Sequence, residues 1–88
     1  MKRAKQEGLH RNAAVAMGNS RSPRYVPALL DALQDDSAMV RLHVAWALGE
    51  IGGEKALAGL EARQPIEPDS HVAQEIDAAL SRLEEPDA

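Results

Sequence analysis

Apolar residues recur through residues 40–52 at the spacing of an α-helix. One stripe consists of Val40, Val44, Ala47, Leu48 and Ile51, and a second stripe beside it of Met39, Leu42 and Trp46. A helix with two apolar flanks needs a packing partner on each side. We therefore expect this helix to lie in the middle of a stack, with Asp36 or Ser37 as its N-cap and Gly52-Gly53 as its stop.

The same apolar pattern occurs once before and once after this segment. At an offset of 31 the earlier copy is Leu9, Ala13, Ala16, Met17 and Gly18, and at an offset of 32 the later copy is Val72, Ile76, Ala79 and Leu80. Self-similarity at a fixed period of this length is typical of stacked helical repeats. The pattern predicts an all-α fold, a short α-α superhelix (solenoid) of about five helices.

We divide the chain into a basic lead-in at residues 1–8, a repeat domain of two helix pairs and a closing helix at residues 9–83, and a frayed tail at residues 84–88. The first helix is expected over residues 9–17, with a stop at Gly18-Asn19. The second helix of the second pair is expected over residues 54–63. Residues 64–69 contain two prolines and predict a mobile loop, after which Asp69 or Ser70 caps the last helix.

Two prolines complicate the segment between the first two repeats. Ser22-Pro23 is a helix-start signal, but Pro27 would remove a backbone hydrogen bond at the fifth helical position. Either a short turn covers residues 23–25 and the helix starts near Pro27, or one helix is kinked there.

The composition excludes several kinds of chemistry. The 88 residues contain no cysteine, and therefore no disulfide, thiolate nucleophile or iron–sulfur ligand. No apolar run approaches the ~20 residues of a membrane span, and no secretory signal is present, so we expect a soluble, cytoplasmic protein. No Ser, His and carboxylate have a catalytic spacing and no Gly-rich phosphate loop occurs. We expect neither catalysis nor a cofactor or metal site in this chain.

The net charge of −4 hides an asymmetry between the two halves. Residues 1–34 carry six Lys/Arg and two Asp/Glu, whereas residues 35–88 carry four Lys/Arg and twelve Asp/Glu. A basic end is typical of nucleic-acid contacts, although a solvated repeat surface is the simpler interpretation. Candidate phosphate contacts are Lys2, Arg3, Lys5, Arg11, Arg21, Arg24 and Arg41. For Arg41 we favour an alternative, an ion pair with Asp35 or Asp36.

One string resembles HEAT-like repeats of the short bacterial type. The matching residues are Asp36, Val40, Arg41, Ala45, Leu48, Gly49, Ile51 and Gly52. A sharper resemblance, carried by residues 2–20 and 40–49, is to the C-terminal portion of bacterial epoxyqueuosine reductases, which act in queuosine synthesis in tRNA. The R-N-A-x-x-A-x-G-N element is residues 11–19 here, and H-x-A-W-A-L-G is residues 43–49.

This resemblance covers nearly the whole chain but a minor part of the family's full length. It implies a helical repeat domain that follows the catalytic domains and helps to hold tRNA. The family's cobalamin and two [4Fe–4S] clusters belong to a catalytic region that this chain lacks. The resemblance therefore implies a fragment, and its own catalytic domain is a further candidate partner for the acidic second half.

Two functions from different classes compete. An accessory tRNA-binding module requires the basic residues on one continuous face, whereas a stand-alone scaffold that binds a protein requires an apolar or acidic groove. Among single residues, Trp46 is a candidate for stacking on a base, but its place on an apolar stripe favours packing. His71 and Glu75 are four positions apart and could share a metal ion, but two ligands are too few for a metal site. A surface pair is the favoured interpretation.

Overall fold

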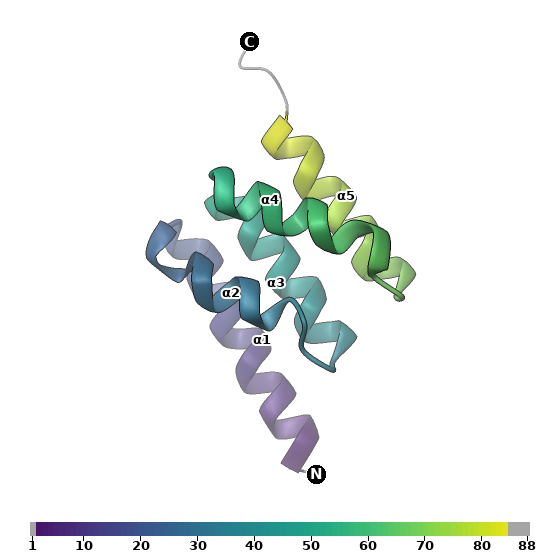
Figure 1. Ribbon diagram of the computed structural model, residues 1–88. Coiled ribbons are helices and arrows are strands. Elements are labelled where there is room, and N and C mark those ends of the chain that lie inside the picture. Colours follow the sequence, from purple (N-terminus) through teal and green to yellow (C-terminus); the bar gives the residue numbers. More distant parts are fainter. Residues whose placement is uncertain (1, 85–88) are drawn as a thin grey trace.

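The computed structural model describes the backbone of residues 2–84 and the side chains of residues 5–84, and within this part all regular structure is helical (Figure 1). The elements in chain order are α1 (Lys2–Ser20), a 3₁₀ turn η1 (Pro23–Tyr25), α2 (Val26–Ala32), α3 (Ala38–Ile51), α4 (Glu54–Arg63), a 3₁₀ turn η2 (Gln64–Ile66) and α5 (Ser70–Glu84). The predicted all-α fold of five helices is confirmed.

The helices form two layers. In Figure 1 α1, α3 and α5 lie side by side in the rear layer, and α2 and α4 cross in front of them. The central helix α3 packs against both α1 and α5, as its two apolar flanks predict, while α2 packs mainly against α3. The main stripe of α3 is buried: Val40, Val44, Ala47 and Leu48 are each at most 1% exposed. Burial of this stripe between the layers is the main stabilising contribution.

Glycines inside the helices allow close contact within the rear layer. A Cβ atom on Gly18 of α1 would lie 2.6 Å from Cζ3 of Trp46 and 2.9 Å from Cα of Ala47. One repeat later, a Cβ on Gly49 of α3 would lie 2.8 Å from Cβ of Ala79 in α5. Gly18 was expected to stop the first helix, but α1 continues to Ser20. The missing side chain of Gly18 is needed for packing between helices instead.

The first helix is longer than predicted at both ends. It begins at Lys2 instead of Leu9, so residues 2–8 of the predicted lead-in are helical. The residue that takes the left-handed conformation after α1 is Arg21, with φ +55°, in place of Gly18-Asn19. At the other end of the chain, Glu84 is the last residue of α5, and the remainder of the predicted tail lies outside the described residues.

Other local predictions are confirmed. The short turn η1 covers Pro23–Tyr25 and is followed by the separate helix α2, so the first of the two alternatives is correct. The hydroxyl of Ser37 accepts a hydrogen bond from Val40 N–H at the start of α3. The carboxylate of Asp69 accepts from His71 N–H and Val72 N–H at the start of α5. Gly52 and Gly53, with φ +73° and +94°, separate α3 from α4.

Candidate functional site

The cationic side chains of α1 do not share one side of the helix. Lys5 is exposed, whereas Arg11 is half-buried and its guanidinium lies 3.4 Å from Asn12 Oδ1 and 4.0 Å from Met39 Sδ. These residues are six positions apart, which places them about 120° apart around the helix axis. The side chains of Lys2 and Arg3 lie outside the described residues. The described part of α1 therefore carries two separate cations.

Arg21 and Arg24 flank the connection between α1 and α2. Both are exposed, but Arg21 lies 3.5 Å from the carboxylate of Glu50 in α3. Its side chain is 73% exposed, and an ion pair this open contributes little to stability and is available for exchange with a phosphate. The guanidinium of Arg24 lies 5.0 Å from the ring centre of Tyr25, a cation–π distance. This connection is the second cationic region of the described surface.

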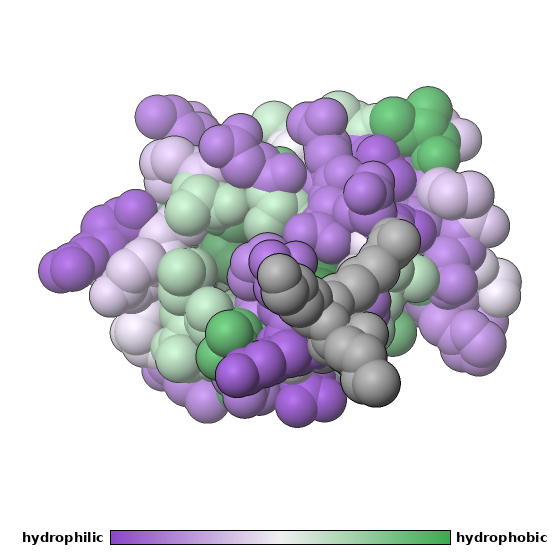
Figure 2. Space-filling model, turned by 90° about the horizontal axis from the view of Figure 1, so that it is seen from below, coloured by the Kyte–Doolittle hydropathy of each residue, from purple (hydrophilic) through white to green (hydrophobic). Residues whose placement is uncertain are grey.

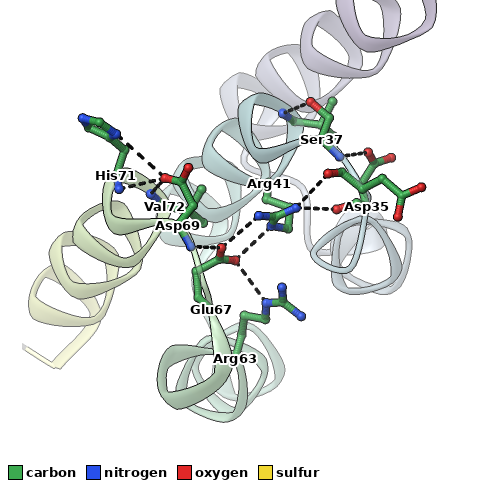
Figure 3. A network of polar contacts seen from close by, with 10 residues as sticks. Asp35, Ser37, Arg41, Arg63, Glu67, Asp69, His71 and Val72 are labelled. Atoms are coloured by element: carbon green, nitrogen blue, oxygen red, sulfur yellow. Dashed lines mark hydrogen bonds and ion pairs between the residues drawn. The ribbon is translucent and has the colours of Figure 1, made fainter. Parts of the chain in front are cut away.

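Arg41, the seventh candidate, points into the protein (Figure 3). Its side chain is 8% exposed and donates two parallel hydrogen bonds of 3.0 Å to the carboxylate of Glu67. It also donates to the main-chain carbonyls of Asp35, at 2.7 Å, and Asp36, at 3.1 Å. This geometry matches the alternative interpretation of Arg41 as one half of an ion pair, but the carboxylate belongs to Glu67 and not to Asp35 or Asp36.

Glu67 is the centre of this network. Its side chain is 0% exposed, and its carboxylate accepts further hydrogen bonds from Arg63, at 3.2 Å, and from Asp69 N–H, at 2.9 Å. Burial alone would raise the pKa of the Glu67 carboxyl, but the hydrogen bonds from Arg41, Asp69 and Arg63 outweigh it and lower the pKa. The hydrogen bond to Glu67 raises the pKa of Arg41. The network therefore holds both side chains in their charged forms.

The network gives the segment after α4 an unexpected role. Residues 64–69 were expected to form a mobile loop, yet Glu67 connects this segment to Arg41 of α3, which in turn binds the loop before α3. We did not single out Glu67 from the sequence. A single glutamate between two prolines carries no periodic signal, and its partner Arg41 is 26 positions away. The four donors identify Glu67 as a structural residue.

An apolar groove lies between α1 and α2 and has a volume of about 390 Å³. Figure 2 shows the end of the molecule where α1 begins, with apolar surface in a hollow bordered by hydrophilic side chains. The lining residues of this α1–α2 groove on the helices include Ala13, Ala14, Met17, Ala28, Leu29 and Ala32. Two carboxylates, Asp31 and Asp35, also line it. The groove thus has the apolar and acidic character expected of a protein-binding surface.

The other candidates have structural explanations. Trp46 is partly buried and packs against the hydrophobic core, as its place on an apolar stripe predicts. His71 lies 3.9 Å from Asp69, the N-cap of α5, and no group of three possible metal ligands occurs in the described part of the chain. Without cysteine, the chain offers no thiolate for an iron–sulfur cluster. None of the helices described is long and apolar enough to cross a membrane.

Comparison with known proteins identifies the repeats. The family of HEAT repeats matches residues 2–81. An epoxyqueuosine reductase of Bacillus cereus is 34% identical over 76 residues, which is 85% of this chain and 20% of that enzyme. A deoxyhypusine hydroxylase of Rattus norvegicus is 38% identical over 78 residues, which is 86% of this chain and 26% of that enzyme. No solved structure matches significantly.

The two groups of relatives carry different enzyme names. The chain spans about a fifth of the length of the epoxyqueuosine reductase and about a quarter of the length of the deoxyhypusine hydroxylase. What the chain shares with both is a helical repeat segment, and the similarity by itself does not assign either activity to it.

Proposed function

Because the chain belongs to the HEAT-repeat family, we propose that it is a non-catalytic repeat module of an epoxyqueuosine-reductase-type enzyme and helps to bind tRNA. The observation that carries the proposal is the set of exposed cations at Lys5, Arg21 and Arg24, together with the half-buried Arg11, in the first third of a chain whose remainder is acidic. None of these four residues belongs to the buried Arg41–Glu67 network. Their charges are therefore not used by the ion pair between Arg41 and Glu67.

The choice of this enzyme name over the other rests on sequence elements, because relatives of both names match a similar share of this chain. The resemblance to epoxyqueuosine reductases rests on the two elements at residues 11–19 and 43–49, and an enzyme of that name is 34% identical over most of this chain. Such an enzyme must hold tRNA while it acts on one nucleoside, and a repeat module supplies added phosphate contacts. Iron–sulfur chemistry would belong to another region, since this chain has no cysteine, and the resemblance assigns cobalamin to that region as well.

The geometry predicts weak, salt-sensitive binding. The described cations of α1 and of the α1–α2 connection lie in separate places and do not form the one continuous face that was expected of a tRNA-binding module. The acidic second half also repels phosphate. If Lys5, Arg11, Arg21 and Arg24 each neutralise one phosphate, the log–log slope of affinity against salt should be about −3 to −4. A phosphate must also displace Glu50 from Arg21, but this exposed pair is worth at most about 1 kcal/mol.

A matched pair of double variants tests the proposal. Lys5→Glu with Arg24→Glu, and Lys55→Glu with Arg82→Glu, each change the net charge from −4 to −8, since each replacement changes it by −2. All four side chains are exposed. Titration of labelled tRNA at two salt concentrations should show that the first pair weakens binding and reduces the salt slope by about half. The second pair should leave binding nearly unchanged.

Equal losses in the two double variants would contradict the proposal, because they would indicate diffuse attraction without a binding surface. The isolated chain should also give no visible absorption band after incubation with cobalamin, or with iron and sulfide. Such a band would show that the chain holds redox chemistry of its own.

A second candidate function is protein binding without a role in tRNA recognition. The α1–α2 groove favours it, since charge and apolar surface meet there as a protein-binding scaffold requires. Absence of tRNA binding by the parent chain at low salt would select this candidate.

A further inference from the structure

In the second repeat, a leucine side chain covers the position that corresponds to the wall of the α1–α2 groove in the first repeat. Leu29 in α2 and Leu60 in α4 are both buried and differ by the repeat offset of 31, so Gly59 corresponds to Ala28. A Cβ atom on Gly59 would collide with the end of the Leu30 side chain. A leucine of α2 therefore covers Gly59, whereas its counterpart Ala28 is exposed on the wall of the α1–α2 groove.

The walls of the groove have the geometry of a seat for one helix. Ala13 and Met17 on α1 face it at a spacing of four residues, and Ala28 and Ala32 on α2 do the same. Residues four apart lie on one side of a helix, so each wall is a straight row. Leu29 also lines the groove and is 2% exposed, buried with the core.

The lysine, arginine and carboxylate side chains among the described lining residues of the groove are all carboxylates. Asp31 and Asp35 line the groove, and Glu7 and Asp36 line an adjoining hollow of about 160 Å³. Neither lining contains a lysine or arginine among the described residues; His10 contributes to both and lies 3.6 Å from Asp35. The carboxylates of Asp31, Asp35 and Asp36 at one end of an apolar groove attract a cationic partner and repel nucleic acid.

We propose that the α1–α2 groove binds one amphipathic helix of a protein partner. Its leucine-type side chains would pack between Ala13 and Ala28, as Leu30 packs on Gly59, and its lysine or arginine side chains would lie beside Asp31 and Asp35. This inference does not depend on tRNA binding, because neither Lys5 nor Arg11 lines the groove.

A second copy of the chain fits the groove poorly. Copies stacked end to end would bring the far side of α5 to it, and the exposed residues there are mostly polar: Gln74, Asp77, Ala78 and Ser81. The neighbouring helix α4 exposes Glu61. Asp77 and Glu61 would add negative charge to a contact that Asp31 and Asp35 already border, so like charges would oppose it.

Two synthetic helical peptides test the proposal on the full chain. Both have an alanine background and four leucines spaced as Val26, Leu29, Leu30 and Leu33 are. On the side of the helix away from the leucines, one peptide carries lysines and the other carries glutamates. Fluorescence anisotropy should show binding of the lysine peptide and at least about tenfold weaker binding of the glutamate peptide. Equal affinities for the two peptides would overturn the proposed charge recognition.

Matched variants locate the binding. Ala28→Leu fills the groove and should weaken binding of the lysine peptide at least about tenfold, a loss of about 1.4 kcal/mol. Ala58→Leu makes the same change at an exposed position of α4 and should have no effect. Asp31→Lys should weaken binding about threefold, and Glu61→Lys should not. Circular dichroism melts check that the variants remain folded.

Two results would refute the assignment. Equal effects of Ala28→Leu and Ala58→Leu would show that the peptide binds elsewhere. Sedimentation experiments could also show that the parent chain self-associates and that Ala28→Leu abolishes this self-association. That result would assign the groove to a second copy of the chain.

Discussion

Replacement of Arg41 by methionine would remove the cation from the buried network while retaining most of the apolar side chain. The fully buried carboxylate of Glu67 would lose two hydrogen bonds of 3.0 Å and keep those from Arg63 and Asp69 N–H. The carbonyls of Asp35 and Asp36 would lose their donor as well. One substitution would therefore remove the contacts of α3 with residues 64–69 and with the loop that precedes α3.

The structure sets the expected magnitude. Removal of one partner of a buried ion pair costs about 3–5 kcal/mol, because the remaining charge is left in a poorly solvated site. An 88-residue domain has a total stability of about 4–13 kcal/mol. By contrast, Arg63 is 18% exposed and donates one hydrogen bond of 3.2 Å to Glu67, so Arg63→Met should cost about 1–2 kcal/mol.

Urea unfolding followed by circular dichroism measures these differences. Arg41→Lys is a milder variant that retains the charge but cannot make the two parallel bonds, and it should fall between the parent and Arg41→Met. The double variant Arg41→Met with Glu67→Leu should recover part of the loss, since no buried charge remains. Equal costs for Arg41→Met and Arg63→Met would refute the reasoning, because they would show that Arg41 is not the principal partner of Glu67.

Three further outcomes follow from the same contacts. The pKa of Glu67 is lowered in the folded chain, so its contribution to stability is present above the pKa of an unfolded glutamate and is lost as the pH falls through the folded value; urea titrations should show a smaller acid-side loss for Glu67→Gln. Gly18→Ala should cost about 1–3 kcal/mol, because Cβ would overlap Trp46 and the backbone of Ala47, whereas Gly8→Ala, with open space around it, should stabilise the chain by up to about 1 kcal/mol in the same thermal melts. Trp46→Ala should cost roughly 3 kcal/mol, and melting curves that overlay the parent's would contradict its packing role.

Several features of this protein follow from the sequence alone. The apolar stripes are local periodic signals, and their three copies, at offsets of 31 and 32, predict a recurring helix with α3 as its middle copy. Caps are equally local, since Ser37 and Asp69 bond to main-chain groups two or three residues away. Such features depend on near neighbours, and the one-dimensional pattern contains them.

Only the tertiary structure decides the roles that depend on distant contacts. The sequence favours an ion pair for Arg41 with a nearby aspartate, but the fold selects the partner, because it brings Glu67 beside Arg41 from 26 positions away. Gly18 has the sequence signature of a helix stop, but the approach of Trp46 and Ala47 makes it a packing position. Ala28 and Gly59 occupy equivalent positions, yet one lines an open groove and the other is covered by Leu30. Periodicity specifies which side of a helix is apolar, whereas the packing of neighbouring helices decides which part of that side remains open to a partner.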